Sequence, residues 1–432
     1  MSGDRFLISS GAISLLIRIG GAATALVASI VLARYLGTEG YGAYAFSIAL
    51  VMLLSIPAQL GLPNLVLRET ARMQASGDMA HLRAVWRWAT FAVFGLSASM
   101  MLAALVFWWS GISSASETTL FLFAIPIIPL VALGSIRGAA LRGLGFVNLG
   151  QLPEMLLRPF FLLLGIAILT FAGCQITPDY VLIVYILSAF SSFLVGTYWF
   201  FRLRPKLDDT STGTQVDRPE WWKATFILGL AASIQTTNAK IDIVMLGLMQ
   251  DQAEVGIYRA ATSLASVVGF GLLSLNAIIM PRIAMFFNLG ETAALQKLVT
   301  RSAQISFIAA FSATLLLFFL GENILVKTFG EAYISAFTVV LILASGQVAN
   351  AFFGPIAGLL NMTNQEHATM IGAMTGLATN IILNVILVPH YGGKGAAIAT
   401  AISVLTWNAV LFFLSRGLIG ITSTAIPYLT RK

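Results

Sequence analysis

The sequence predicts an all-α integral membrane protein of about twelve transmembrane helices, arranged as two pseudo-symmetric six-helix lobes. Three observations lead to this fold class. Of the 432 residues, 58% are hydrophobic and only 10% are charged, and the mean hydropathy is +0.88, whereas soluble proteins carry about 25% charge. Apolar runs long enough to cross a membrane recur along the chain, and the two halves of the chain resemble each other.

Each predicted span is an apolar run of roughly 20 residues, the length of helix that crosses about 30 Å of hydrocarbon. The first run, 11–33, contains Arg18 and is followed by no small-residue cleavage site, so it predicts a retained span rather than a signal peptide. The remaining predicted spans, in chain order, are 42–66, 86–109, 118–136, 149–171, 180–201, 224–248, 258–281, 302–320, 333–355, 370–389 and 396–414.

The distribution of Lys and Arg predicts the orientation in the membrane. With the N-terminus in the cytoplasm, one set of loops holds 18 of the 25 basic residues, including Arg137 and Arg142. The opposite set holds only three, Arg34, Lys327 and Lys394. Because cytoplasmic loops of membrane proteins are enriched in Lys and Arg, both termini are expected to be cytoplasmic.

A polar stretch at the midpoint of the chain, 202–223, separates six predicted spans from six. The predicted organisation is an N-terminal lobe over 1–201, a cytoplasmic linker over 202–223 and a C-terminal lobe over 224–432. An internal repeat supports it, because LARYLGTEGYGAYAFSIAL after the first span is echoed by MLGLMQDQAEVGIYRAATSL after the seventh. Six spans return the chain to its starting side, so the two copies share one orientation.

The runs ARYLGTEGYGAYAF, GLPNLVLRETAR and IDIVMLGLMQDQAEVGIYRAATSL carry a family resemblance. They resemble the polysaccharide transporter family, the Wzx-type O-antigen and exopolysaccharide repeat-unit flippases of the multidrug/oligosaccharidyl-lipid/polysaccharide exporter superfamily. The resemblance implies two lobes around a central cavity and movement of undecaprenyl-diphosphate-linked oligosaccharides across the bacterial inner membrane. The implied partners are that substrate, membrane lipids, and polysaccharide polymerase and chain-length machinery, with a monomer as the working unit.

An anionic, lipid-linked sugar diphosphate needs cationic groups in a polar lumen, and three residues within or at the ends of spans are candidates. Arg18 lies about seven residues into the first span; it faces the lumen or snorkels to the cytoplasmic interface. Arg158 belongs to the fifth span and Lys240 to the seventh. Lys240 serves either as a second cationic anchor or as a helix–helix contact.

Two acidic residues within spans are candidates for ion coupling. Glu154 lies four residues before Arg158 and therefore on the same helix face, where it forms either a structural ion pair or a pair that exchanges partners when substrate enters. Pro153 and Pro159 would let this helix kink beside the charges. Asp242 binds a cation or a proton, or it forms a salt bridge to a neighbour such as Lys240 or Arg259 through another helix.

Other function classes lack the residues they need. The chain has no phosphate-binding GxxxxGK[ST] loop and no HExxH motif, and its lone Cys174 and three histidines argue against a metal cluster. No catalytic residue, metal site or cofactor is therefore predicted. The dilute net charge of +7 argues against nucleic-acid binding. A membrane polysaccharide polymerase would need a larger extracytoplasmic loop. A multidrug/toxin extrusion antiporter of the same superfamily is the main alternative, although the first span offers Arg18 and no acidic residue.

Overall fold

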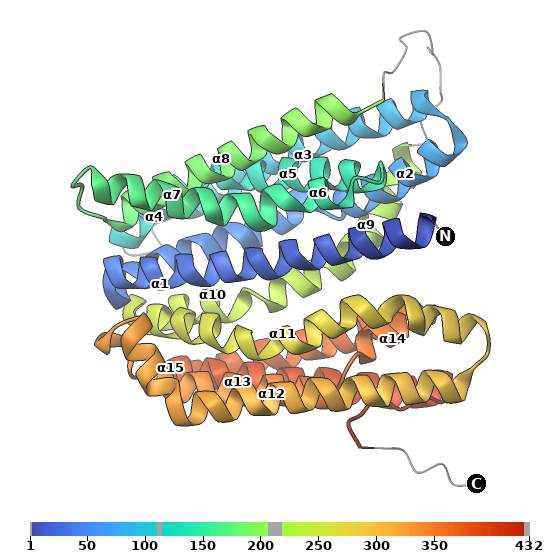
Figure 1. The fold of residues 1–432 in the computed structure, drawn as a ribbon. Coiled ribbons are helices and arrows are strands. Elements are labelled where there is room, and N and C mark those ends of the chain that lie inside the picture. The colour runs from blue at the N-terminus through green and yellow to red at the C-terminus, as the bar shows by residue number, and fades with distance from the viewer. Residues whose placement is uncertain (1, 110–114, 206–217, 427–432) are drawn as a thin grey trace. The chain divides into compact units, whose positions relative to one another are not determined.

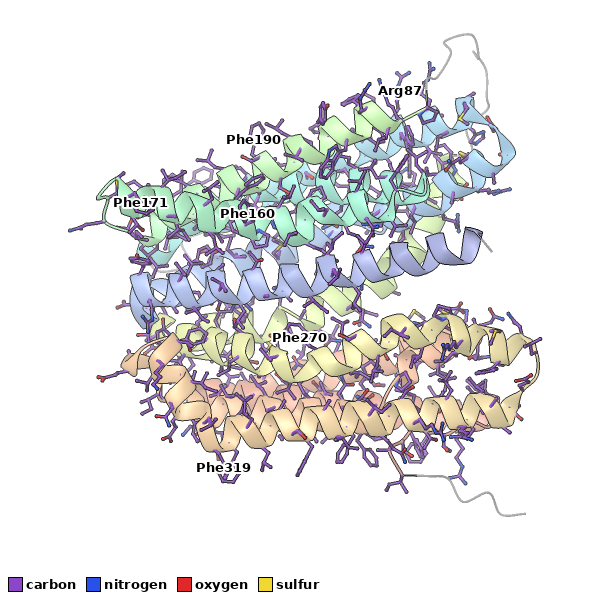
Figure 2. The ribbon with its side chains drawn as sticks, in the orientation of Figure 1. Arg87, Phe160, Phe171, Phe190, Phe270 and Phe319 are labelled. Carbon is purple, nitrogen blue, oxygen red and sulfur yellow. The ribbon has the colours of Figure 1, made fainter. Side chains whose placement is uncertain are left out.

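The computed structural model describes residues 2–109, 115–205 and 218–426, and every regular element in these ranges is a helix (Figure 1). Nine of the described helices are long and apolar enough to cross a membrane. Large apolar side chains cover their outer surfaces; Phe171 and Phe319, which are 93% and 70% exposed, point outward in Figure 2. Such a surface suits hydrocarbon, because helices satisfy their own backbone hydrogen bonds there.

The described residues up to Asn238 form ten helical elements. In order, the elements are α1 (Ser2–Gln59), α2 (Leu62–Ser76), α3 (Met79–Trp109), α4 (Ala115–Ala124), α5 (Ile127–Gly143), α6 (Val147–Leu152), the π-helix η1 (Pro153–Leu157), α7 (Arg158–Phe171), α8 (Pro178–Leu203) and α9 (Arg218–Asn238).

The described residues from 241 to 426 form seven helical elements. They are α10 (Ile241–Met249), α11 (Gln252–Asn288), α12 (Thr292–Thr328), the 3₁₀-helix η2 (Glu331–Tyr333), α13 (Ala336–Phe353), α14 (Ile356–Met362) and α15 (Glu366–Ile419).

Two of the long helices each contain a sharp kink at a glycine. In α1 the kink is at Gly37, with φ 68° and ψ −175°, and in α15 it is at Gly392, with φ 53° and ψ −133°. L-residues with side chains rarely adopt these positive φ values, so glycine is required at both places. Helix α15 therefore supplies the predicted spans 370–389 and 396–414. Helix α1 supplies 11–33 and residues 42–59 of the span predicted over 42–66, whose last residues lie in the following turn and in α2.

Other predicted spans are interrupted. The span predicted over 149–171 is divided into α6, η1 and α7, with Pro153 at the start of the π-helical turn. Proline lacks a backbone donor, and π-helical turns are frequent at functional sites. The span predicted over 224–248 is divided between α9 and α10 by a turn at Ala239 and Lys240.

Contacts within the chain define two compact units. The first contains residues 1–28 and 43–240, and the second contains residues 29–42 and 241–432. Compared with the predicted lobes, α9 packs with the first unit, and the segment 29–42 packs with the second. Residues 206–217, most of the predicted linker, lie outside the described residues, and the predicted lobe boundaries stay a prediction.

In the second unit, the segment 29–42 is attached through backbone contacts. Gly42 lies against α11, where a β-carbon on Gly42 would be 2.8 Å from the amide nitrogen of Gly256. The Tyr333 hydroxyl donates hydrogen bonds to the carbonyls of Ala33 (3.1 Å) and Gly37 (2.8 Å). Gly42 stands two residues before a tyrosine in the first repeated run, and Gly256 does so in the second. These two matching glycines lie next to each other.

Candidate functional site

The π-helical turn of the first unit carries a buried charge cluster. Glu154 lies in η1, and its Oε2 is 3.1 Å from Nη1 of Arg158, one turn later. Its other oxygen, Oε1, is 3.7 Å from Nη2 of Arg137 on α5. One carboxylate therefore faces two guanidinium groups, and the cluster keeps an excess of positive charge. The side chains of Glu154 and Arg158 are only 26% and 22% exposed.

Arg137 is the most buried member of this cluster, at 7% exposure. Its Nη1 donates hydrogen bonds to the Phe193 carbonyl and to the Thr197 hydroxyl, the latter at 3.0 Å. Its guanidinium carbon lies 4.8 Å from the Phe193 ring centroid, close enough for a cation–π contact. Gly196 makes room for the guanidinium, since a β-carbon there would lie 2.6 Å from Cζ of Arg137.

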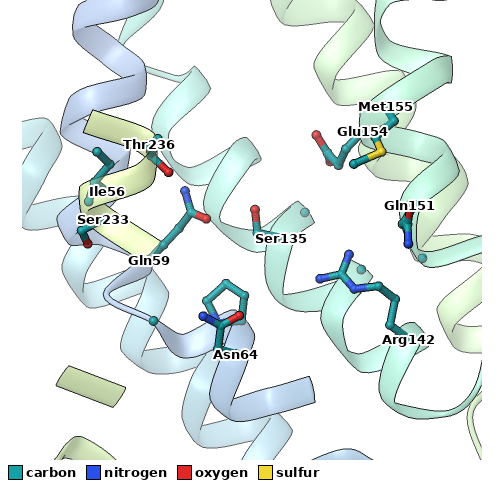
Figure 3. Close-up of a pocket in the computed structure, with 15 residues that line it drawn as sticks. Ile56, Gln59, Asn64, Ser135, Arg142, Gln151, Glu154, Met155, Ser233 and Thr236 are labelled. Carbon is teal, nitrogen blue, oxygen red and sulfur yellow. The ribbon is translucent and has the colours of Figure 1, made fainter. Parts of the chain in front are cut away.

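A polar cavity of about 280 Å³ opens beside the cluster, within the first unit. Figure 3 shows the Arg142 guanidinium and the Glu154 carboxylate pointing into it. The other polar side chains on its wall come from α1, α2, α5, α6 and α9; they are Gln59, Asn64, Ser135, Gln151, Ser233 and Thr236. We call this cavity the charged pocket. It combines a cation, an anion and amide groups inside an otherwise apolar helical unit.

The predicted site residues of the first unit lie at different places. Arg158 is the first residue of α7, and its guanidinium carbon lies 5.8 Å from the Tyr185 ring centroid. Arg18 has an exposed side chain on α1, and its positive charge repels the positive charge of Arg142. Lys240 is half-buried in the turn after α9. The ion-pair partner of Arg158, Glu154, lines the charged pocket.

Two arginines that the sequence predicts in a cytoplasmic loop lie in a helix instead. Helix α5 continues to Gly143 and includes both Arg137 and Arg142. The misplaced boundary came from the charges themselves, which ended the apolar run at 136. The sequence GSIRGAALRG over 134–143 contains a signal that was missed, because its glycines allow helices to pack closely around a buried guanidinium. For example, Gly138 on α5 lies against the backbone of Gly150.

Asp242 lies at the start of α10 in the second unit and is 7% exposed. Its Oδ2 accepts hydrogen bonds from the hydroxyls of Tyr258 (3.2 Å) and Thr400 (2.8 Å), and its Oδ1 accepts one from Nδ2 of Asn384 (2.9 Å). Asn384 Nδ2 also lies 3.1 Å from Oδ1 of Asn380. Neutral hydrogen-bond donors thus surround the buried carboxylate of Asp242. Folding brings these donors together from distant parts of the chain.

The fold is similar to that of transporters of known structure. The structure is similar to an inward-facing multidrug resistance MATE family transporter of the MOP superfamily, with a TM-score of 0.75 at 14% identity over 95% of this chain and 98% of that chain. It is also similar to the lipid II flippase MurJ in an inward closed conformation, with a TM-score of 0.67 at 16% identity over 94% of this chain and 87% of that one. The predicted fold class is confirmed.

Sequence comparison finds two relatives that are named as probable flippases. It is 25% identical over 171 residues to the probable low-salt glycan biosynthesis flippase Agl15 of Haloferax volcanii, and 22% identical over 224 residues to the probable flippase AglR of the same organism. These alignments cover 40% and 51% of this chain but only 36% and 46% of the relatives. The profile of the polysaccharide biosynthesis protein family matches residues 7–287, and the chain therefore belongs to this family of multi-pass membrane proteins.

Proposed function

We propose that this protein is a flippase that moves polyprenyl-diphosphate-linked oligosaccharide repeat units from the cytoplasmic to the periplasmic leaflet by alternating access, for assembly of a surface polysaccharide. The observation that carries the proposal is the charged pocket inside the first unit. Burying charge in a membrane-spanning unit is costly, and intramembrane ionisable residues commonly mark a substrate pathway. Membership of the polysaccharide biosynthesis protein family supports the same assignment.

Each part of the charged pocket suits one part of such a substrate. The Arg142 guanidinium can form paired hydrogen bonds with a diphosphate, which an ammonium group does less well. The amides of Gln59 and Asn64 can donate to and accept from sugar hydroxyls. Glu154 holds Arg158 beside the pocket, where a bound phosphate can replace the carboxylate as its partner. Arg18 and Lys240 are proposed as further cationic groups along the path.

The test is complementation of a bacterial strain that lacks its own repeat-unit flippase, with surface polysaccharide and the lipid-linked intermediate measured together. The parent chain should restore polysaccharide and remove the accumulated intermediate. Arg142→Gln should lower restoration about tenfold or more, because a charge-assisted hydrogen bond contributes roughly 1.5–3 kcal/mol. Arg142→Lys should retain part of the activity, because the charge survives without the planar fork.

The matched control is Arg202→Gln, which removes an exposed arginine in the last turn of α8, outside the charged pocket. It should restore polysaccharide as the parent does. All variants are first quantified in the membrane fraction, so that loss of protein is separated from loss of transport. Equal restoration by Arg142→Gln and the parent would refute a role of this pocket in transport, and Arg18→Ala and Lys240→Ala test the remaining cationic groups in the same strain.

We further propose that Asp242 binds a proton or a monovalent cation that couples to transport. The support is chemical: a buried carboxylate lies among neutral oxygen-bearing groups, and Oδ1 of Asn384 is buried without a hydrogen-bond partner among the described residues. Oxygen donors with a single negative charge suit a small hard cation. Glu154 is the second candidate, although it already faces Arg137 and Arg158.

Transport in sealed vesicles with imposed proton or sodium gradients tests the coupling. Asp242→Asn should remove the dependence of transport on the gradient, and Glu154→Gln examines the second candidate. Asp179→Asn, an exposed residue in the first turn of α8, is the matched control and should respond to the gradient as the parent does. Transport by Asp242→Asn that rises with the gradient as steeply as in the parent would refute coupling at this residue.

For the topology, we propose both termini in the cytoplasm and an inner-membrane location. Reporter fusions after Arg204 and after Arg416 should read as cytoplasmic, and a fusion after Glu117 should read as periplasmic. The charge asymmetry of the loops supports this orientation. A periplasmic signal after Arg204 would refute it.

Export of cationic drugs is the alternative function, and the fold is compatible with it. The composition of the charged pocket disfavours it, because Arg142 lines the wall and Glu154 is neutralised by two arginines. Resistance to cationic dyes conferred on a sensitive strain, without restoration of polysaccharide in the flippase-deficient strain, would favour the antiporter.

A further inference from the structure

A second cavity, of about 440 Å³, lies in the first unit between α3 and α8. Helix α5 packs against both of these helices and forms the floor. Ile136 and Ala140 of α5 line this cavity, whereas Gly138 and Arg142 line the charged pocket. Successive residues of a helix point about 100° apart, so the two cavities lie on opposite faces of α5. We call the second cavity the α3–α8 groove.

The wall formed by α3 changes from cationic to aromatic along one helix face. Arg83, Arg87, Phe91 and Phe94 all line the groove and follow one another at intervals of three or four residues, the spacing of a single helix face. Figure 2 labels Arg87, which lines the groove together with Phe201 and Arg204 near the C-terminal end of α8. Phe91 and Phe94, further along α3, are 69% and 53% exposed.

The wall formed by α8 has the same arrangement of residue types, but their order along the chain is reversed, with phenylalanine first and arginine last. Phe193, Thr197, Phe201 and Arg204 line the groove at intervals of three or four residues. The guanidinium carbon of Arg204 lies 4.4 Å from the Phe201 ring centroid. Arginines therefore stand on both walls at the end that the charge asymmetry assigns to the cytoplasm, and phenylalanines stand on both walls toward the membrane interior.

The floor of the groove carries a polar atom that lacks a partner. Arg137 lines the groove and is 7% exposed, and its Nη atoms contact Phe193, Thr197 and Glu154. Its Nε is buried and has no hydrogen-bond partner within the described ranges. A buried donor left without a partner is unfavourable. An acceptor atom that enters the groove could therefore accept a hydrogen bond from this Nε.

We propose that the α3–α8 groove binds one anionic phospholipid of the bilayer. Its phosphate contacts Arg87 and Arg204 at the membrane interface, and an acyl chain runs along Phe91 and Phe94 toward the bilayer centre. Charge complementarity selects an anionic headgroup, because arginine clusters at the cytoplasmic interface attract anionic lipids. The exposed phenylalanines give the chain an apolar track that a soluble phosphate would not use.

The position of the groove identifies the bilayer lipid, rather than the lipid-linked sugar, as its occupant. A glycan attached to a phosphate in the groove would lie across α5 from the amides of the charged pocket. The groove itself offers few groups for sugar hydroxyls, since its wall between the arginines is largely aromatic and aliphatic. This proposal does not depend on the flippase function.

Native mass spectrometry of the full-length protein, delipidated in mild detergent, tests the proposal by titration with phosphatidylglycerol and, separately, phosphatidylcholine. The parent should bind one phosphatidylglycerol at least tenfold more tightly than phosphatidylcholine. Arg87→Gln or Arg204→Gln alone should weaken phosphatidylglycerol binding about fivefold, and both together about 30-fold, as expected for loss of one and two interfacial charges. Arg202→Gln, which removes an exposed arginine from the same end of α8 outside the groove, should bind as the parent does.

Three results would overturn the proposal. The first is equal affinity of the parent for the two phospholipids. The second is a loss with Arg202→Gln as large as the loss with Arg87→Gln and Arg204→Gln combined. The third comes from competition: if a polyprenyl diphosphate displaces the bound phosphatidylglycerol at equimolar concentration, the groove belongs to the carrier lipid. Circular dichroism of each variant verifies that the helical content is retained, because all three arginines are exposed.

Discussion

Replacement of Glu154 by Gln removes the single acidic group from a cluster with two arginines. The carboxylate is 3.1 Å from Arg158 and 3.7 Å from Arg137, and at an effective dielectric constant of about 20 each contact amounts to roughly 4–5 kcal/mol of direct attraction. Desolvation offsets much of this, and removing one partner of a fully buried pair costs about 3–5 kcal/mol. The side chains of Glu154 and Arg158 are about one-quarter exposed to solvent, which weakens the contact. We therefore expect Glu154→Gln to destabilise the protein by about 2–3 kcal/mol.

A double-mutant cycle separates the pair from the other contacts of each residue. Arg158→Met alone should destabilise the protein by a similar amount, because it leaves Glu154 with only the longer contact to Arg137. With both substitutions, the loss should be smaller than the sum by roughly 2 kcal/mol, within the range for contacting residues. The free energy of unfolding is measured by SDS titration in mixed micelles, followed by tryptophan fluorescence.

The control cycle combines Glu154→Gln with Arg202→Gln, whose side chain is exposed at the last turn of α8. These two substitutions should add to within about 0.5 kcal/mol. If the cycle of Glu154 with Arg158 is equally additive, the ion pair contributes nothing to stability and the reasoning about the buried cluster is wrong.

Two further predictions concern the second unit and a control glycine on α3. Gly42→Ala should destabilise the protein by roughly 1–3 kcal/mol in the same SDS titration, because the added β-carbon would clash with the backbone carbonyl of Gln252 and would lie 2.8 Å from the amide nitrogen of Gly256. Gly95→Ala, where a β-carbon meets nothing within 4 Å, should be neutral or slightly stabilising; an equal loss in both variants would contradict the packing argument. Tyr333→Phe should lose about 1–2 kcal/mol, because its hydroxyl donates to two backbone carbonyls, including that of Gly37, and unchanged stability would show that these bonds do not hold the kink of α1.

The sequence was sufficient for features that depend on local pattern. Hydropathy alone located most of the apolar runs that form the long helices, because a helix in hydrocarbon needs about 20 apolar residues wherever it lies in the fold. The four-residue spacing of Glu154 and Arg158 predicted that they share a helix face, and they lie 3.1 Å apart. Pro153 indicated an irregular helix, and a π-helical turn begins there. In each case the relevant neighbours lie within one or two helical turns.

Features that depend on distant parts of the chain could not be predicted in this way. The donors to Asp242 come from Tyr258, Asn384 and Thr400, which lie 16, 142 and 158 residues away. Arg137 was assigned to a loop because a charged residue ended the apolar run, whereas its burial depends on Gly196 of a different helix. A charge inside a membrane helix is tolerated only when tertiary partners satisfy it, and a single sequence does not reveal those partners.

The Arg137 side chain contacts groups on both faces of α5. Its Nη2 lies 3.7 Å from Glu154, which lines the charged pocket, while the same side chain lines the α3–α8 groove with an unpaired Nε. A phosphate held by Arg87 and Arg204 would be a second anion in the groove that this guanidinium lines, and its attraction would weaken the contact of Arg137 with Glu154. Weakening that contact leaves Glu154 more strongly associated with Arg158, at 3.1 Å. Occupancy of the lipid site should therefore change how readily Arg158 exchanges its carboxylate for a substrate phosphate, which joins the two proposals through one side chain.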